Sequence, residues 1–122
     1  MAALQLPKVT RLMAFPMQKG ELRGFCTILK MAVGSKVVSA PLIEEWLTFL
    51  TSTVLGGGLS TRHKNLGYPK PLIVGNPVEA VLRLEWLKKI PGQSDSFAHF
   101  SVRGVSNNET VVEGDFTVIV PP

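Results

Sequence analysis

The chain of 122 residues has the length of one domain, and we expect residues 1–122 to form a single domain. Hydrophobic residues make up 45% of it, enough for a core, whereas charged residues make up only 18%. This low charged fraction favours a homodimer or a higher homo-oligomer, which would bury further apolar surface. The formal net charge of +4 fits an anionic ligand or simply a mildly basic protein, because no long Lys/Arg run forms an electrostatic arm.

Local sequence indicates where the protein is located and which roles its cysteine can have. The stretch "MAALQLPKVTRLMAF" lacks the form of a secretory signal, because Pro7, Lys8 and Arg11 interrupt its apolar residues. No uncharged apolar stretch is long enough to span a bilayer, so we expect a cytoplasmic protein with no membrane partner. Cys26 is the single cysteine, which excludes an internal disulfide and a multi-cysteine metal site. Its apolar neighbours predict a buried small hydrophobic side chain.

Two strands and a helix are expected in the first half. Residues 9–17 form a short strand that Pro16 ends, and residues 21–33 form a second strand with a bend at Gly24. A helix follows from Pro41 to Leu55, because proline suits the first helical position. Its apolar residues recur at helical spacing: Ile43, Trp46, Leu47, Leu50 and Val54. The polar side carries Glu44, Glu45, Thr48, Thr51 and Ser52, and the helix ends at Gly56, Gly57 and Gly58.

The second half is dominated by expected strands. Residues 59–79 are rich in turn-formers and hold at most one short strand, near residues 72–74. Alternating patterns then predict three strands, at 80–90, 97–105 and 110–120. The strand at 80–90 aligns Leu82, Leu84 and Trp86 on one face, so Trp86 is expected in the core together with Trp46.

A tight turn and the order of elements complete the predicted fold. Asn107 and Asn108 form the turn between the last two strands, because asparagine tolerates positive φ. The resulting order is two strands, one long helix, a short strand and three strands. The predicted class is α+β, with a single long helix packed on a mostly antiparallel sheet.

Three stretches give this order a family resemblance: "APLIEEWLTFLTSTVLGG", "YPKPLIVGNPVEAVLRLEWLKK" and "HFSVRGVSNNETVVEGDFTVIVPP". They resemble the central helix, the strand–turn–strand segment and the closing hairpin of the hotdog fold of acyl-thioester enzymes, which include thioesterases, MaoC-like hydratases and FabZ-like dehydratases. The resemblance covers roughly residues 40–122. It implies a hotdog-like α+β fold, a dimer whose sheets join edge to edge, and an acyl-CoA or acyl-carrier thioester as ligand, with no other cofactor.

The chain departs from these families at the places where they carry catalytic residues. The loop ahead of the helix, "AVGSKVVSAP", has no histidine, and the turn "VGNPVE" lacks the usual acidic residue. The carboxylates of the helix, Glu44 or Glu45, remain. These departures from the family pattern place dehydration in doubt. The resemblance still leaves hydrolysis by a helix carboxylate open.

Candidate site residues come from the helix and from the basic cluster that follows it. Glu44 and Glu45 are candidates for a general base or nucleophile, for which burial would raise the pKa, or are acidic residues favoured by the helix start. His63 is a second candidate base, or part of an exposed loop. Arg62, Lys64 and Asn65 would meet the anionic end of a ligand. His63 and His99 lack the partners of a metal motif, so no metal site is expected.

Three functions remain open on the sequence alone. The first is an acyl-thioester binding protein, as a thioesterase or a hydratase/dehydratase. The second is a non-enzymatic α+β module that binds a protein partner or another ligand. The third, nucleic-acid binding, is disfavoured, because the strands lack the interleaved aromatic and basic residues of a sheet that stacks bases.

Overall fold

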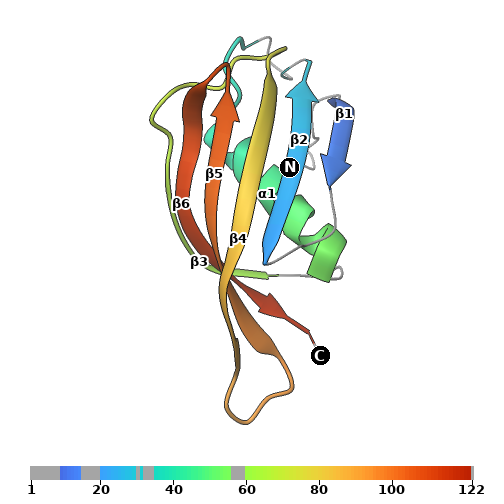
Figure 1. Cartoon of the computed structure of the whole chain (residues 1–122), viewed down its shortest axis with the longest axis vertical. Coiled ribbons are helices and arrows are strands. Elements are labelled where there is room, and N and C mark those ends of the chain that lie inside the picture. The colour runs from blue at the N-terminus through green and yellow to red at the C-terminus, as the bar shows by residue number, and fades with distance from the viewer. Residues whose placement is uncertain (1–8, 15–19, 30, 32–34, 56–59, 122) are drawn as a thin grey trace, which may run out of the picture.

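The structure, a computed structural model, describes residues 9–14, 20–29, 31, 35–55 and 60–121, without the side chains of 9–14, 53–54 and 60–62. Its elements are β1 (Val9–Ala14), β2 (Glu21–Ile28), α1 (Ala40–Leu55), β3 (Ser60–Gly67), β4 (Pro77–Lys89), β5 (Ser96–Ser106) and β6 (Glu109–Val120). The strands form one sheet in the order β1-β2-β4-β5-β6-β3, with every neighbouring pair antiparallel. Helix α1 lies across one face of this sheet (Figure 1). The predicted α+β class is confirmed.

The core lies between α1 and the sheet. The helix buries Leu42, Ile43, Trp46, Leu47 and Leu50 against apolar side chains of the strands, among them Leu22, Leu82, Phe100 and Val118. The predicted apolar face of the helix is confirmed, except that Val54 lies outside the described side chains. Thr51, predicted on the polar side, is fully buried. Its Oγ1 donates to the carbonyls of Leu47 and Thr48, so the hydroxyl is satisfied inside the helix.

Gly24 allows α1 to lie close to β2. A Cβ atom added to Gly24 would lie 2.5 Å from Cδ1 of Leu50, a helix residue with no exposed surface. A side chain at this position would displace the fully buried side chain of Leu50. Gly24, where the sequence predicts a bend, therefore leaves room for the side chain of Leu50 against β2.

The short strand of the middle segment differs from the prediction. It is β3, Ser60–Gly67, whereas Ile73 forms only an isolated bridge with Val37. The predicted strand at residues 72–74 is therefore wrong. Among the described strands, β3 lies at the edge of the sheet and pairs only with β6, so it tolerates the polar sequence "STRHKNLG" that reads as a loop.

In the second half of the chain, one local prediction is confirmed and another is wrong. Asn107 and Asn108 have φ values of 51° and 62°, which confirms the predicted turn between β5 and β6. The register of β4 against β5 shifts between Leu84 and Trp86. This irregularity turns the side chain of Trp86 out of the core, and it is 37% exposed. The predicted core position of Trp86 is therefore wrong, whereas Trp46 is buried as predicted. The predicted helix end at Gly56, Gly57 and Gly58 lies outside the described residues.

Candidate functional site

The two glutamates of α1 do not lie at its very start. The helix begins at Ala40, and no acidic residue lies in its first turn. Glu44 and Glu45 occupy the second turn, beyond the strongest influence of the helix terminus. Their placement therefore needs a reason other than the helix macrodipole.

Glu44 is bound by two side chains, one on β3 and one just after the end of β3. Lys64 forms an ion pair with Oε1 of Glu44 and donates a hydrogen bond to it. The phenol of Tyr68 donates to Oε2 of Glu44 over 2.8 Å. Both carboxylate oxygens are thus engaged, and the side chain of Glu44 is only 24% exposed.

The environment makes Glu44 an anion and Tyr68 a neutral donor. Partial burial by itself would raise the pKa of Glu44, but the hydrogen bonds from Lys64 and Tyr68 and the charge of Lys64 together hold it below its ordinary value. Burial, and then the hydrogen bond to Glu44, raise the pKa of Tyr68. The lowered pKa of Glu44 is the opposite of the raised value expected for a general base.

A groove of about 580 Å³ opens beside this cluster, between α1 and β3, and we call it the α1–β3 groove. Its polar lining includes Glu44, Glu45, Thr48 and Lys64. Its apolar lining includes Leu47, Phe49, Leu66 and Phe116. Within the described part of the chain, Glu45 has no hydrogen bond or ion pair, so one carboxylate of the groove is fixed and the other is free.

The structure brings some of the predicted site residues together and separates others. Glu44, Glu45 and Lys64 share the α1–β3 groove. His63 and Asn65 are exposed, and because they flank Lys64 on β3, they point to the opposite face of the sheet. The side chain of Arg62 lies outside the described residues. Sequence reasoning missed Tyr68, which a β3 strand carrying Lys64 and Leu66 on one face would have revealed.

The other histidine and the cysteine lie away from the groove. On the outer face, Nδ1 of His99 lies 2.8 Å from Oγ1 of Thr117, and Nε2 lies 3.3 Å from Oδ2 of Asp115. Its ring stacks on Trp86 at 5.1 Å between centroids. Cys26 is buried as predicted, and burial raises the pKa of its thiol to about 11, which disfavours a thiolate nucleophile.

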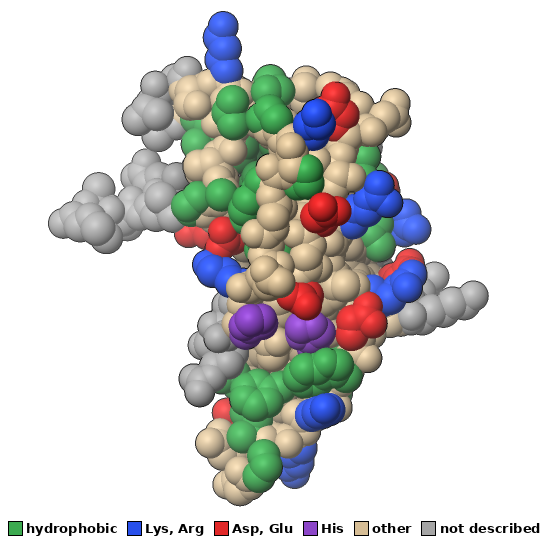
Figure 2. Space-filling model, turned by 90° about the vertical axis from the view of Figure 1, so that its left-hand side faces the viewer, with side chains coloured by type: hydrophobic (Ala, Val, Ile, Leu, Met, Phe, Trp, Pro, Cys, Tyr) green, Lys and Arg blue, Asp and Glu red, His purple; other side chains and the backbone are tan. Residues whose placement is uncertain are grey.

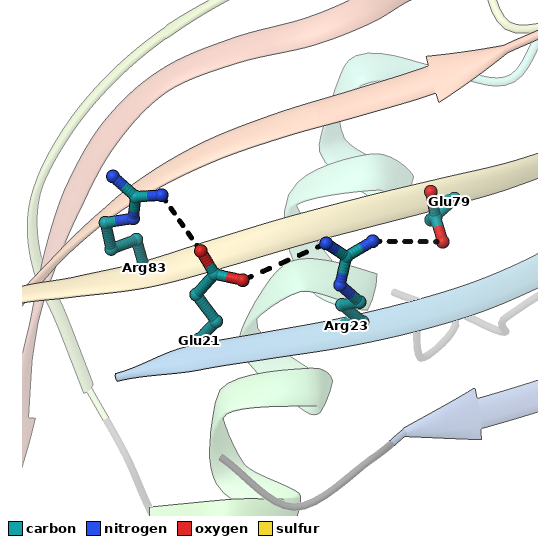
Figure 3. Close-up of polar contacts among 4 residues, drawn as sticks. All are labelled: Glu21, Arg23, Glu79 and Arg83. Carbon is teal, nitrogen blue, oxygen red and sulfur yellow. Dashed lines mark hydrogen bonds and ion pairs between the residues drawn. The ribbon is translucent and has the colours of Figure 1, made fainter. Parts of the chain in front are cut away.

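A second charged cluster lies on the sheet face away from α1 (Figure 3). Arg83 donates to Oε1 of Glu21 over 2.9 Å, and Arg23 lies 3.9 Å from Glu21 and 3.8 Å from Glu79. These residues line a smaller space of about 420 Å³. No described helix covers this face in Figure 1, and the side chains of the four residues are 31–61% exposed.

Metal and membrane features can be judged for the described residues only. Among them, no three His, Cys, Asp or Glu side chains gather as metal ligands would. None of the described helices is long and apolar enough to cross a membrane.

No protein-family model matches the sequence, and no curated protein matches it. Solved structures do match, at low sequence identity. The HP0420 homologue from Helicobacter felis is 16% identical, with a TM-score of 0.66 over 89% of this chain and 77% of that one. A hypothetical thioesterase with coenzyme A from Streptococcus pneumoniae is 12% identical, with a TM-score of 0.67 over 90% and 85%. A MaoC-like dehydratase from Rhodospirillum rubrum is 15% identical, with a TM-score of 0.58 over 74% and 65%.

These likenesses agree with the order of elements, the antiparallel sheet and the helix lying across one face of it. The structural match extends along most of the chain, beyond residues 40–122 on which the sequence resemblance rested. The chain therefore has the hotdog fold that the sequence predicted.

Proposed function

We propose that this protein binds an acyl thioester, of coenzyme A or of an acyl carrier, in the α1–β3 groove and hydrolyses it. The observation that carries the proposal is the pairing of a fixed carboxylate, Glu44, with a free one, Glu45, at the polar side of a groove with apolar lining. A likeness to the structure of a hypothetical thioesterase with coenzyme A supports the same ligand class.

The groove suits an acyl chain on one side and a reacting carbonyl on the other. Leu47, Leu66 and Phe116 offer apolar surface, and each buried methylene of a ligand contributes about 0.8 kcal/mol at most. Lys64 and Thr48 lie in the same lining, where they can meet polar groups of the ligand. This division matches the chemistry of an acyl thioester.

Glu45 is the residue that we assign to the chemical step. Its carboxylate accepts a proton from a water molecule, whose oxygen attacks the thioester carbonyl and forms the new C–O bond. The C–S bond then breaks, and the leaving thiolate takes the proton from Glu45, which restores the carboxylate. Glu44, engaged through both oxygens, keeps the second turn of α1 and strand β3 in place around the reacting group.

Hydrolysis is favoured over dehydration by the make-up of the groove. Among the described residues that line it, none is a histidine, and His63 lies on the other face of the sheet. The second candidate function is a binding protein without turnover. The lowered pKa of Glu44 makes that carboxylate a weak base, so this candidate is favoured if Glu45 does not carry the chemical step.

The homodimer belongs to the proposal too. Among the described strands, β3 ends the sheet with β6 as its neighbour, so its other edge can pair with β3 of a second copy. This pairing would place the α1–β3 groove at the boundary between subunits. Cytoplasmic location and a ligand contact by Arg62 stay predictions.

The test is hydrolysis of acyl-CoA thioesters, from acetyl to palmitoyl, by the wild type, Glu45→Gln and Glu44→Gln. Glu79→Gln is the matched control, since Glu79 is an ion-paired glutamate on the outer face. We expect Glu45→Gln to lower kcat about 100-fold or more with KM retained, and Glu79→Gln to have no effect. Binding without turnover by the wild type would support the second candidate, and no binding of any thioester would overturn both.

A further inference from the structure

Two segments beside the start of α1 run next to each other, residues 36–41 and 68–74, and we call them the ribbon. The amide of Val38 donates to the carbonyl of Leu72 over 2.8 Å, which joins the two segments. The first segment leads into α1 and the second leads toward β4. Figure 1 shows the start of both elements at the end of the molecule away from the β4–β5 hairpin.

One side of the ribbon is buried and the other is exposed. Val38 and Leu72 belong to the hydrophobic core. Their neighbours Val37 and Ile73 form a bridge with each other and are 44% and 39% exposed. The ribbon is thus anchored in the core while it presents a pair of large apolar side chains to solvent, as surfaces that bind a partner do.

The end of β2 extends this apolar surface. The amide of Gly75 donates to the carbonyl of Ile28 over 2.7 Å, which brings the end of β2 next to the ribbon, and Leu29 follows with 44% of its surface exposed. Leu29, Val37 and Ile73 are three of the six exposed large hydrophobic residues that the structure describes. Figure 2 shows hydrophobic side chains at this upper end of the molecule, with a Lys or Arg side chain extending beyond them.

The charge of this surface is positive. The ribbon contains Lys36 and Lys70, both exposed, and no Asp or Glu. Neither lysine has an ion pair among the described residues. Glu109 at the start of β6 and Glu79 near the start of β4 are acids of the same end, but Glu79 is paired with Arg23, so the lysines remain in excess. A partner must therefore present negative charge beside apolar side chains.

The ribbon borders the α1–β3 groove. Pro41, the last residue of its first segment, lines the groove, and Tyr68, the first residue of its second segment, donates to Glu44. Glu45 lies four residues beyond Pro41, which is about 6 Å along the axis of α1 at about 1.5 Å per residue. A molecule bound to the ribbon can therefore extend a group into the groove.

We infer that the ribbon docks a protein that delivers the acyl thioester to the groove, with acidic side chains against its two lysines and apolar side chains over Val37 and Ile73. The inference rests on the proposed function, and it names an acyl carrier protein rather than coenzyme A as the source of the substrate. The lysines alone would serve the phosphates of coenzyme A, whereas a protein covers the apolar pair as well. A small mixed surface suits a partner that dissociates after each turnover.

The test is calorimetric titration of the full chain with an acyl carrier protein that bears phosphopantetheine but no acyl group, so that docking is measured apart from hydrolysis. The lysine variant is Lys36→Gln/Lys70→Gln, and the matched control is Lys88→Gln/Lys89→Gln, which removes two exposed lysines of the β4–β5 hairpin. We expect the lysine variant to bind about tenfold more weakly, at about threefold per lysine, and the control to bind like the wild type.

A second pair of variants tests the apolar contact. Val37→Thr/Ile73→Thr removes the exposed apolar pair and keeps β-branched side chains in the ribbon. Leu87→Thr is its control, because Leu87 is 58% exposed on β4 beside the hairpin. We expect the ribbon variant to bind the carrier protein about tenfold more weakly and Leu87→Thr to bind it like the wild type.

Hydrolysis separates a failure of this inference from a failure of the proposed function. Both ribbon variants should hydrolyse octanoyl-CoA like the wild type, because the ribbon does not hold the acyl chain. Carrier binding that depends on the ribbon, without hydrolysis of any thioester, would overturn the hydrolytic function alone. No carrier binding, equal weakening by both lysine pairs, or loss of octanoyl-CoA hydrolysis in the lysine variant would overturn the inference.

Discussion

The two faces of the sheet carry similar charged groups in different settings. On the inner face, Glu44 is bound by Lys64 and Tyr68 beneath the side of α1. On the outer face, Glu21 and Glu79 alternate with Arg23 and Arg83, as Figure 3 shows. Both clusters join neighbouring elements through carboxylates, but only the inner one lies beside a helix.

The helix makes the difference between the two clusters. It removes most of the side chain of Glu44 from water and supplies apolar walls to the α1–β3 groove. The contacts of Glu44 with Lys64 and Tyr68 lower the pKa of its carboxyl, and Glu44 and Lys64 lie at the polar side of that groove. On the open face, Arg23 is 53% exposed, and its ion pairs are screened by solvent. Charged residues in an ordered network are therefore no evidence of a site unless their surroundings exclude water.

The largest expected effect comes from separating β3 from β6. Gly114 has a φ of 140°, and a Cβ atom there would clash with the backbone carbonyl of Asn65, next to Lys64. We expect Gly114→Ala to lower the free energy of unfolding by about 3 kcal/mol and to detach Lys64 from Glu44. Denaturant unfolding measures the loss.

Gly67→Ala is the control for this change. A Cβ atom at Gly67 would lie 3.9 Å from the Glu113 carbonyl oxygen, an ordinary contact. Its effect should be small. Equal stability of Gly114→Ala and the wild type would show that β3 and β6 are not packed as described.

Tyr68→Phe tests the inner cluster directly. It removes a hydroxyl that donates to a mostly buried carboxylate, so we expect a loss of about 1.5 kcal/mol in the free energy of unfolding. Ser101→Ala is the matched outer change, since its hydroxyl donates to exposed Glu85 over 2.7 Å. If the two variants lost the same stability, the distinction between the faces would fail.

The pH dependence of the Tyr68→Phe variant sharpens this comparison. Because the pKa of folded Glu44 lies below its ordinary 4.5, its stabilising contribution is complete above pH 4.5 and is lost as the pH falls through the folded pKa. Loss of the Tyr68 hydrogen bond raises that folded pKa toward 4.5. The stability difference between wild type and variant should therefore shrink below pH 4.5, as unfolding curves at a series of pH values would show; a constant difference would contradict it.

The smallest effect is expected for Glu79→Gln. Glu79 lies 3.8 Å from exposed Arg23, and such surface pairs contribute less than about 0.5 kcal/mol. The change in the midpoint of denaturant unfolding should be close to the error of the measurement. A loss as large as that of Tyr68→Phe would mean that the outer ladder stabilises the sheet in its own right.

The fold could be predicted further from the sequence than the site could. Strict periodicity located α1 and the three long strands, because apolar residues recur on the faces that they bury. It failed at β3, where a polar edge strand has little to bury, and at Trp86, where one irregularity reverses the facing of the strand. Thr51 was misplaced because a hydroxyl that binds helix carbonyls can be buried like an apolar group.

The site depends on contacts that are distant in sequence. Glu44 and Glu45 were identified from their helix, but Lys64 and Tyr68 reach Glu44 from 20 and 24 residues away. No local pattern shows which of two adjacent carboxylates will be engaged. The distinction between a fixed Glu44 and a free Glu45 emerges only once β3 is placed beside α1.

The most direct test of the account is to map the binding of an acyl-CoA thioether, which cannot be hydrolysed, by amide chemical shifts in NMR spectra. We predict shifts that centre on Thr48, Leu66 and Phe116, around the α1–β3 groove. Shifts that centre instead on Arg23, Arg83 and Arg103 on the outer face would contradict the central claim.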